Sequence, residues 1–184
     1  MPRQKITTPE IIGIAINVFR NNGYHGTSMA KLAEACGLMK GSFYNHFSSK
    51  EDILLVTIRS LNDYLNERIF KIAYDNALKP KDRMKKILNK LSNVLRSDQG
   101  GCLVGNMTLE LYNGHNEFRQ ILEKYFQDWL NAFTTIFAEK YKNKRAEKLA
   151  RLSIQEFEGA IMMGRIFKDD ELLSETIDTI TSRL

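Results

Sequence analysis

The chain has 184 residues, of which 43% are hydrophobic and 27% charged, and its formal net charge is +5. This composition indicates an ordinary globular protein of one or two small domains with a buried core. No apolar run reaches the ~18 residues of a membrane-spanning helix, so we expect no membrane partner. The two cysteines lie far apart and the N-terminus lacks the apolar stretch of a signal peptide, which indicates a cytoplasmic protein without disulfides.

Helical periodicity runs through the chain, and no stretch has the alternation typical of strands. Pro9 suits the first turn of the first helix, and Gly23 suits its end. Ser49 caps a long helix whose first turn is acidic. We expect helices over about 8–22, 50–75, 81–96, 102–113, 116–141, 145–167 and 170–183, and two short helices in between, within 27–47.

The stretch from Thr27 to Phe47 has the pattern of two short helices joined by a tight turn. Thr27 or Ser28 caps the first helix, and Gly37 provides the positive φ that ends it. In the second helix, Phe43 and Phe47 lie four residues apart and point inward, which leaves the polar side chains outside. This layout predicts a helix-turn-helix, whose second helix enters the major groove of DNA.

The basic residues gather on the same part of the chain. The first fifty residues carry six lysines and arginines against two glutamates, which is a net charge of +4 out of the total of +5. Neutralising DNA phosphates requires such an excess. The alternative is a merely solubilising surface, because many small domains carry as much charge.

Glycines, aromatic residues and basic residues follow a specific order over about fifty residues here. The runs are Gly23-Tyr24-His25-Gly26-Thr27-Ser28, Leu32-Ala33, Cys36-Gly37-Leu38, Lys40-Gly41-Ser42-Phe43-Tyr44-Asn45-His46-Phe47 and Ser49-Lys50-Glu51. They resemble the DNA-binding region of the TetR/AcrR family of bacterial transcriptional regulators. Met39 departs from the family pattern, where a small polar residue is common, and is expected to alter operator contacts. Cys36 stands where alanine is common and is expected to be a neutral change.

The resemblance implies roles for the DNA-facing residues. Tyr44, His46 and Lys50 would contact phosphates, and Thr27 and Ser28 would meet a phosphate at a helix N-terminus. The residues that open the second short helix would reach base edges, where a lysine reads guanine acceptors. The alternative is a solvated helix face with no ligand. The expected DNA contacts are Thr27, Ser28, Lys40, Gly41, Ser42, Tyr44, Asn45, His46 and Lys50.

Residues 53–184 are expected to form an antiparallel helical bundle, after a DNA-binding domain over residues 1–52. The whole is then an all-α protein with about nine helices. The layout of the second half resembles the ligand-binding and dimerisation part of the same family. Local matches to one branch are sharper, namely Gly100-Gly101-Cys102-Leu103-Val104-Gly105-Asn106, Leu109-Glu110-Leu111, and Glu158-Gly159-Ala160 with Arg165.

Aromatic residues are frequent in the second half, and Phe126, Trp129, Phe133 and Phe137 form one helical stripe. Such a stripe usually packs in a core. Many large rings together with methionines also suit a pocket for an apolar ligand. The expected pocket residues are Leu91, Leu95, Cys102, Met107, Leu111, Phe126, Trp129 and Met163.

Cys102 follows two glycines and precedes an apolar run, near the expected start of a helix. A helix N-terminus stabilises a thiolate. In the resembling branch, a cysteine in this context serves some members as a sensor of electrophiles or oxidants. The alternative is an inert small apolar residue. Cys36 is expected to be the buried thiol, between the two short helices.

Two helix-turn-helix units are needed for two operator half-sites, which indicates a symmetric homodimer. The resemblance implies an interface on the last two helices, as a four-helix bundle. The alternative is that the same apolar residues pack within one subunit. The expected interface residues are Ile154, Phe157, Ile161, Met162, Ile177 and Ile180.

No motif of catalysis, metal binding or cofactor binding is found in the sequence. We therefore expect no enzyme activity, no cofactor and no metal. The combined pattern predicts a repressor that leaves a near-palindromic operator in double-stranded DNA when a small apolar or electrophilic effector binds. The alternatives are a helical small-molecule-binding protein or enzyme without a DNA role, and an architectural DNA-binding protein without an effector.

Overall fold

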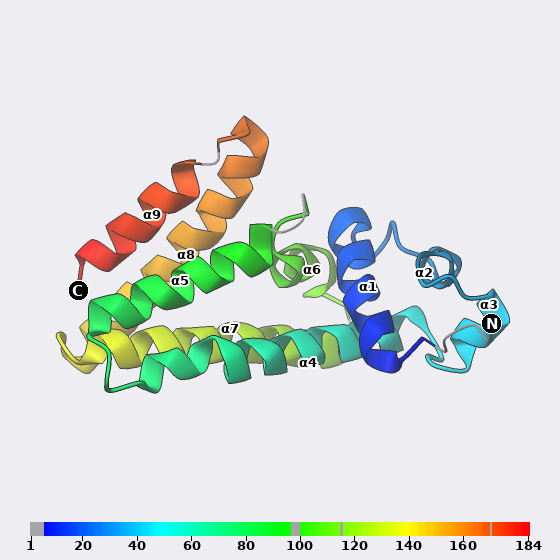
Figure 1. Ribbon diagram of the computed structural model, residues 1–184, viewed down its shortest axis with the longest axis horizontal. Coiled ribbons are helices and arrows are strands. Elements are labelled where there is room, and N and C mark those ends of the chain that lie inside the picture. Colours follow the sequence, from blue (N-terminus) through cyan, green and yellow to red (C-terminus); the bar gives the residue numbers. More distant parts are fainter. Residues whose placement is uncertain (1–5, 97–99, 115, 170) are drawn as a thin grey trace. The chain divides into compact units, whose positions relative to one another are not determined.

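The computed structural model describes residues 6–96, 100–114, 116–169 and 171–184. The regular elements of these residues are helices, and the expected all-α fold is confirmed (Figure 1). The elements are α1 (Thr8–Asn22), α2 (Met29–Ala35), α3 (Lys40–Tyr44), α4 (Lys50–Arg68), the 3-10 helix η1 (Phe70–Tyr74), α5 (Pro80–Arg96), α6 (Leu103–Leu111), α7 (Asn116–Ala138), α8 (Asn143–Phe167) and α9 (Glu171–Ser182). Arg3 and Lys5 of the basic excess, and Asp170 at the expected start of the last helix, lie outside the described residues.

The helix expected over 50–75 ends early, at Arg68, and η1 follows it. Ile69 leaves the α-helical conformation, with φ −121° and ψ −59°. Ile69, Phe70, Ile72 and Ala73 are all buried. Residues so close in sequence point in widely different directions on a straight α-helix, so the change to a tighter helix allows all of them to be buried.

The chain packs as two compact units. The first comprises the residues up to Leu61 together with Leu103–Leu122, and the second comprises Asn62–Cys102 together with Glu123–Leu184. The chain therefore passes between the units inside α4, at the start of α6 and inside α7. The domain boundary expected after residue 52 stays a prediction.

Local signals account for the helices of the first unit. Thr7 and Glu10 form a capping box at the start of α1. The backbone N–H of Thr7 donates to the Glu10 carboxylate, and the backbone N–H of Glu10 donates to the Thr7 hydroxyl oxygen. Gly23 ends α1 with φ +69°, and Gly37 ends α2 with φ +64°. Phe43 of α3 is fully buried. These helices contact one another in the order α1 to α2 and α2 to α3, and α1 also contacts α6.

Aromatic rings around Trp129 form the centre of the second unit. Phe70 stacks on Trp129 with a ring-centre distance of 6.2 Å, and Phe133 and Phe157 each meet it edge to face at 5.9 Å. Such arrangements are favoured by the ring quadrupoles. Trp129 is fully buried. The expected stripe along α7 therefore packs mainly inward.

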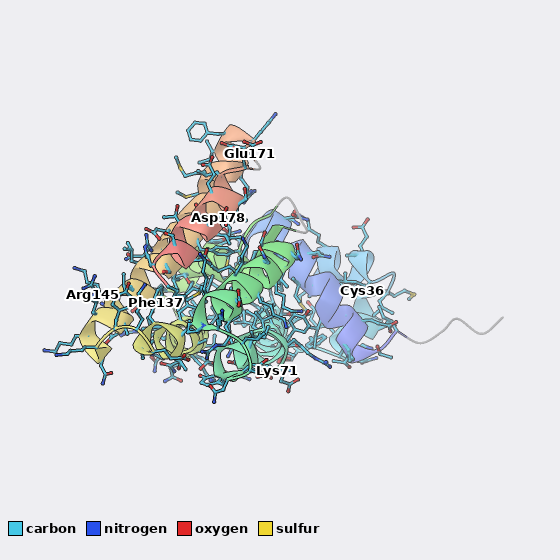
Figure 2. The ribbon with its side chains drawn as sticks, turned by 60° about the vertical axis from the view of Figure 1, so that its left-hand side comes forward. Cys36, Lys71, Phe137, Arg145, Glu171 and Asp178 are labelled. Carbon is cyan, nitrogen blue, oxygen red and sulfur yellow. The ribbon has the colours of Figure 1, made fainter. Side chains whose placement is uncertain are left out.

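The last two helices lie side by side in the second unit (Figure 1), and α9 also contacts α5. Lys85 of α5 pairs with Asp178, which lies on α9 with Glu171 (Figure 2), at an Nζ–Oδ1 distance of 3.2 Å. Arg183 and Glu156 form a second link at the end of α9, with two N–O distances of 2.6 Å. The paired arrangement favours a single register of α9 on its neighbours.

Arg83 joins α5 to two other segments from inside the core. Its side chain is 2% exposed, donates to the carbonyl oxygen of Ala73 at 2.7 Å and pairs with Glu139. We predict that Arg83→Ala lowers the free energy of unfolding by about 3 kcal/mol, because the carbonyl group of Ala73 and the partly exposed carboxylate of Glu139 both lose the buried guanidinium as their partner. Urea denaturation measures this change.

The matched control is Arg151→Ala, because Arg151 forms an exposed pair with Glu147 on α8. Exposed pairs of this kind contribute about 0.5 kcal/mol or less. Equal losses in the two variants would contradict a structural role for Arg83.

Candidate nucleic-acid interface

The short helix α3 presents a polar face to solvent. Lys40, Gly41, Ser42, Tyr44, Asn45 and His46 are exposed. Phe43 and Phe47 point inward, with their ring centres 5.9 Å apart. Met39, just before the helix, is 78% exposed. The residues expected to contact DNA from this helix therefore share one accessible surface, and their individual contacts stay predictions.

Ser28, one of the two residues expected to cap α2, lies at its start. Ser28 is the cap, because its side-chain oxygen accepts a hydrogen bond from the N–H of Lys31 at 3.2 Å. Thr27 is 3% exposed, and its hydroxyl donates to the carbonyl oxygen of Gly23 at 2.6 Å. The expected phosphate contact of Thr27 stays a prediction, although little of its side chain is exposed. Its hydroxyl closes the turn between α1 and α2.

The side chain of Lys50 forms hydrogen bonds within the protein. Its Nζ donates to the carbonyl oxygens of Tyr24 at 2.9 Å and Thr27 at 3.0 Å. The same ammonium group lies 4.0 Å from the centre of the Tyr24 ring, within the range of a cation–π interaction. A phosphate contact by Lys50 must share an ammonium group that already holds the turn.

The turn between α1 and α2 receives a second lysine and a carboxylate. Lys31 Nζ donates to the carbonyl oxygen of Gly26 at 2.8 Å. Oε2 of Glu110, on α6, accepts from the N–H groups of Tyr24 at 2.9 Å and His25 at 3.1 Å. Sequence reasoning missed this role of Glu110. The only local signal was a charged residue between two leucines on a short helix.

Tyr24 is the most connected side chain of this turn. It is buried, its ring meets Phe118 edge to face at 6.0 Å, and its hydroxyl donates to Glu51. Burial, and then the hydrogen bond to Glu51, raise the pKa of Tyr24 above its ordinary value. The same hydrogen bond is the main cause that lowers the pKa of Glu51. The tyrosine therefore ties the turn to α4 and α7 within the first unit.

The expected pocket residues are distributed over both compact units. Leu91, Leu95, Cys102 and Trp129 are buried in the second unit, where Phe126 is half-buried. Met107 and Leu111 are buried in the first unit. Met163 is 39% exposed on α8. The expected pocket stays a prediction.

The two cysteines exchange the burial expected of them. Cys36 is half-buried at the end of α2 (Figure 2), and burial raises the pKa of its thiol. Cys102 is 4% exposed and forms a hydrogen bond with Glu158 of α8. Burial raises the pKa of Glu158, and the hydrogen bond with Cys102 partly opposes that rise. The buried thiol is therefore Cys102, whereas Cys36 was expected to be the buried one.

Four of the expected interface residues belong to the subunit's own core. Phe157, Ile161, Ile177 and Ile180 are at most 7% exposed, so they pack within the subunit, and their expected place in a subunit interface stays a prediction. Ile154 is half-buried. Large apolar side chains do remain exposed along the C-terminal part of α8, namely Met162, Met163, Ile166 and Phe167.

Within the described ranges, no cluster of three or more histidine, cysteine, aspartate or glutamate side chains is arranged to hold a metal ion. None of the helices in the same ranges combines the length and the apolarity needed to cross a membrane.

Two family models match the sequence. Residues 11–57 match the bacterial regulatory proteins of the tetR family, and residues 80–179 match the C-terminal domain of LmrA/YxaF-like transcriptional regulators. The second match alone covers more than half of the chain. The two matched segments contain the helix-turn-helix and most of the helices that follow it.

Known proteins of this kind are similar over nearly the whole chain. The HTH-type transcriptional repressor DhaR from Mycobacterium sp. (strain GP1) is 27% identical over 173 residues, which cover 91% of this chain and 86% of DhaR. A TetR transcriptional regulator from Legionella pneumophila has a TM-score of 0.89 at 21% identity, with 98% of this chain and 99% of that chain covered. FadR from Bacillus subtilis, solved in complex with stearoyl-CoA, has a TM-score of 0.73 at 22% identity, with 97% and 100% covered.

Tyr24→Phe removes the hydroxyl that donates to Glu51, and its effect should depend on pH. The pKa of Glu51 in the folded protein lies below its ordinary value of 4.5. Its stabilising contribution is therefore complete above pH 4.5 and is lost as the pH falls through the lowered pKa. We predict that Tyr24→Phe lowers the free energy of unfolding by about 1 kcal/mol at neutral pH, and that the difference from the wild type becomes smaller in acid.

Chemical denaturation of the wild type and of Tyr24→Phe at pH 7, 5 and 3.5 measures this difference. Tyr64→Phe is the control. Tyr64 is 48% exposed, so loss of its hydroxyl should change the free energy of unfolding little at any pH. A constant gap between wild type and Tyr24→Phe across this range would contradict the link to Glu51.

Proposed function

This chain belongs to the TetR family of bacterial transcriptional regulators, and we propose that it is a homodimeric repressor which a small apolar or electrophilic effector releases from a near-palindromic operator. The observation that carries the proposal is the exposed polar face of α3, with Lys40 at its start and two buried phenylalanines behind it. A short helix supported in this way suits insertion into a major groove.

Dimerisation follows from the geometry of DNA, because two half-sites require two copies of α3. Met162, Met163, Ile166 and Phe167 supply the exposed apolar surface for it. They follow one another at spacings of one, three and one residues, so they form one stripe along α8. We assign the subunit contact to this stripe instead of the buried residues of α8 and α9.

An effector site in the second unit is supported by the aromatic cluster around Trp129. The indole N–H of Trp129 is fully buried and has no hydrogen-bond partner in the described part of the chain. Buried donors are usually satisfied, so an acceptor on a bound molecule would complete this group. FadR, which has this fold, was solved with stearoyl-CoA, an acyl thioester with a long apolar chain. A coupling free energy of about 3 kcal/mol would lower operator affinity on the order of a hundredfold.

The test of DNA reading uses duplexes selected by the protein from a random pool. Lys40→Ala should weaken binding to the selected duplex by about tenfold or more and affect random DNA less, because base contacts and not phosphate contacts carry sequence information. Fluorescence anisotropy at several salt concentrations measures both affinities. The wild-type affinity itself should fall steeply with salt.

Lys71→Ala is the control for Lys40→Ala, because Lys71 is an exposed lysine of η1 in the second unit (Figure 2). Equal losses on selected and random DNA for Lys40→Ala would remove Lys40 from base reading. Absence of salt-dependent DNA binding in the wild type would favour the alternative of a helical small-molecule-binding protein.

The test of assembly is Ile166→Glu. A charge in an apolar contact between subunits costs several kcal/mol, so the variant should be monomeric by light scattering and should lose affinity for the selected duplex. Tyr74→Glu is the control, because Tyr74 is 59% exposed on η1 and lies outside the stripe. An Ile166→Glu protein that stays dimeric would place the subunit contact elsewhere.

A further inference from the structure

Met39 lies directly before α3 and contributes neither to the core nor to the capping of the helix. Its side chain is 78% exposed. It occupies the N-cap position of α3, where no side-chain hydrogen bond closes the helix. Serine, threonine, aspartate or asparagine usually fills such a position, as Ser28 does at the start of α2. The intramolecular contacts of α3 therefore give no reason for a methionine here.

Gly41, two residues later, is a second position that the fold of the chain does not explain. A glycine inside a helix is less stable than an alanine. A Cβ atom on Gly41 would meet no atom within 4 Å, and Gly41 is not among the glycines with positive φ. Neither the backbone conformation nor packing among the described residues therefore requires a glycine. Its effect is to leave the backbone of α3 open to an external surface that approaches closely.

We propose that Met39 is a specificity-determining residue, whose thioether side chain contacts the C5-methyl group of a thymine in each half-site of the operator. This inference rests on the proposed function and names one base that the protein reads. In the major groove, thymine presents a methyl group where the other bases present only hydrogen-bonding groups. The methionine side chain is unbranched and polarisable, so it adapts to a small apolar target.

The surroundings of Met39 favour duplex DNA over a partner protein. Lys40, Ser42 and His46 are exposed beside it. A protein that covered Met39 with an apolar surface would also remove these polar side chains from water, which is unfavourable without new hydrogen bonds. Base edges and phosphates supply the donors and acceptors that such side chains need. The open backbone at Gly41 allows α3 to come close enough for Met39 to reach a base edge.

The first experiment replaces thymine by deoxyuridine, which lacks only the methyl group, in the duplex selected by the wild-type protein. Each thymine is replaced symmetrically in both half-sites, and fluorescence anisotropy at one salt concentration measures the affinities. At one position the wild type should lose affinity on the order of fifteenfold, because each buried methyl group contributes a factor of about four. Equal affinities for thymine and deoxyuridine at every position would overturn the proposal.

Met39→Ala tests whether this side chain is the one that detects the methyl group. The variant should bind the thymine and deoxyuridine duplexes equally well at that position, whereas Met39→Leu, which keeps a large apolar side chain, should retain part of the difference. Leu109→Ala is the matched control and should keep the wild-type ratio of affinities, because Leu109 is 88% exposed on α6 in the same unit. A wild-type ratio in Met39→Ala would assign the methyl contact to another side chain and overturn the role of Met39.

Met39→Ser separates base reading from the stability of α3. It supplies the capping hydroxyl that α3 lacks, so the helix should become more stable. The difference between thymine and deoxyuridine should nevertheless be lost. In selections from a random pool, the wild type should enrich thymine at one position of each half-site, and Met39→Ser should not. The same thymine enrichment in both proteins would overturn the proposal.

The outcomes distinguish a failure of this inference from a failure of the proposed function. Salt-dependent binding to a selected duplex, without any response to the thymine methyl group, would leave the repressor function standing and overturn the reading by Met39. Absence of DNA binding in the wild type would overturn both, because the proposed partner of Met39 is the duplex itself.

Discussion

The backbone of the turn between α1 and α2 is the constraint on which the DNA-reading half depends. Its carbonyl groups are taken by Lys31 and Lys50, and its amides at Tyr24 and His25 by Glu110. A turn has no hydrogen-bond ladder of its own to supply partners for these backbone groups. Charged side chains from three different helices do so here. The arrangement makes the geometry of α2 and α3 depend on the placement of α4 and α6, which is the dependence that a regulated DNA-binding protein needs.

The path of the chain strengthens this dependence. Two of the three passages between the compact units occur inside α4 and α7, where an unbroken hydrogen-bond ladder resists bending. Two of the three covalent connections between the units are therefore helical. The early end of α4 at Arg68 fits the same picture, because η1 fastens the far end of that helix into the aromatic core through Phe70 and Trp129.

Local chemistry was readable from the sequence, and long-range pairing was not. The capping box of Thr7 and Glu10, the positive φ of Gly37 and the inward spacing of Phe43 and Phe47 act over a few residues, so α1 to α3 were predictable. Glu110 acts on residues more than eighty positions away, and no periodicity reports that. Phe157 and Ile180 show a further limit, because an apolar stripe has the same spacing whether it packs inside a subunit or between two. The exposed stripe on α8 could be recognised only from the exposed fractions of its side chains in the structure.

Two opposing influences act on the ionisation of the Cys102 thiol. Their balance affects how readily an electrophile could react with it. The start of α6 favours a thiolate, whereas the neighbouring Glu158 carboxyl disfavours a second negative charge. Burial also disfavours the thiolate directly, because the sulfur is shielded from water and Cys102 is only 4% exposed. A thiol that is hydrogen-bonded to a carboxyl group inside the core reacts only after the site opens.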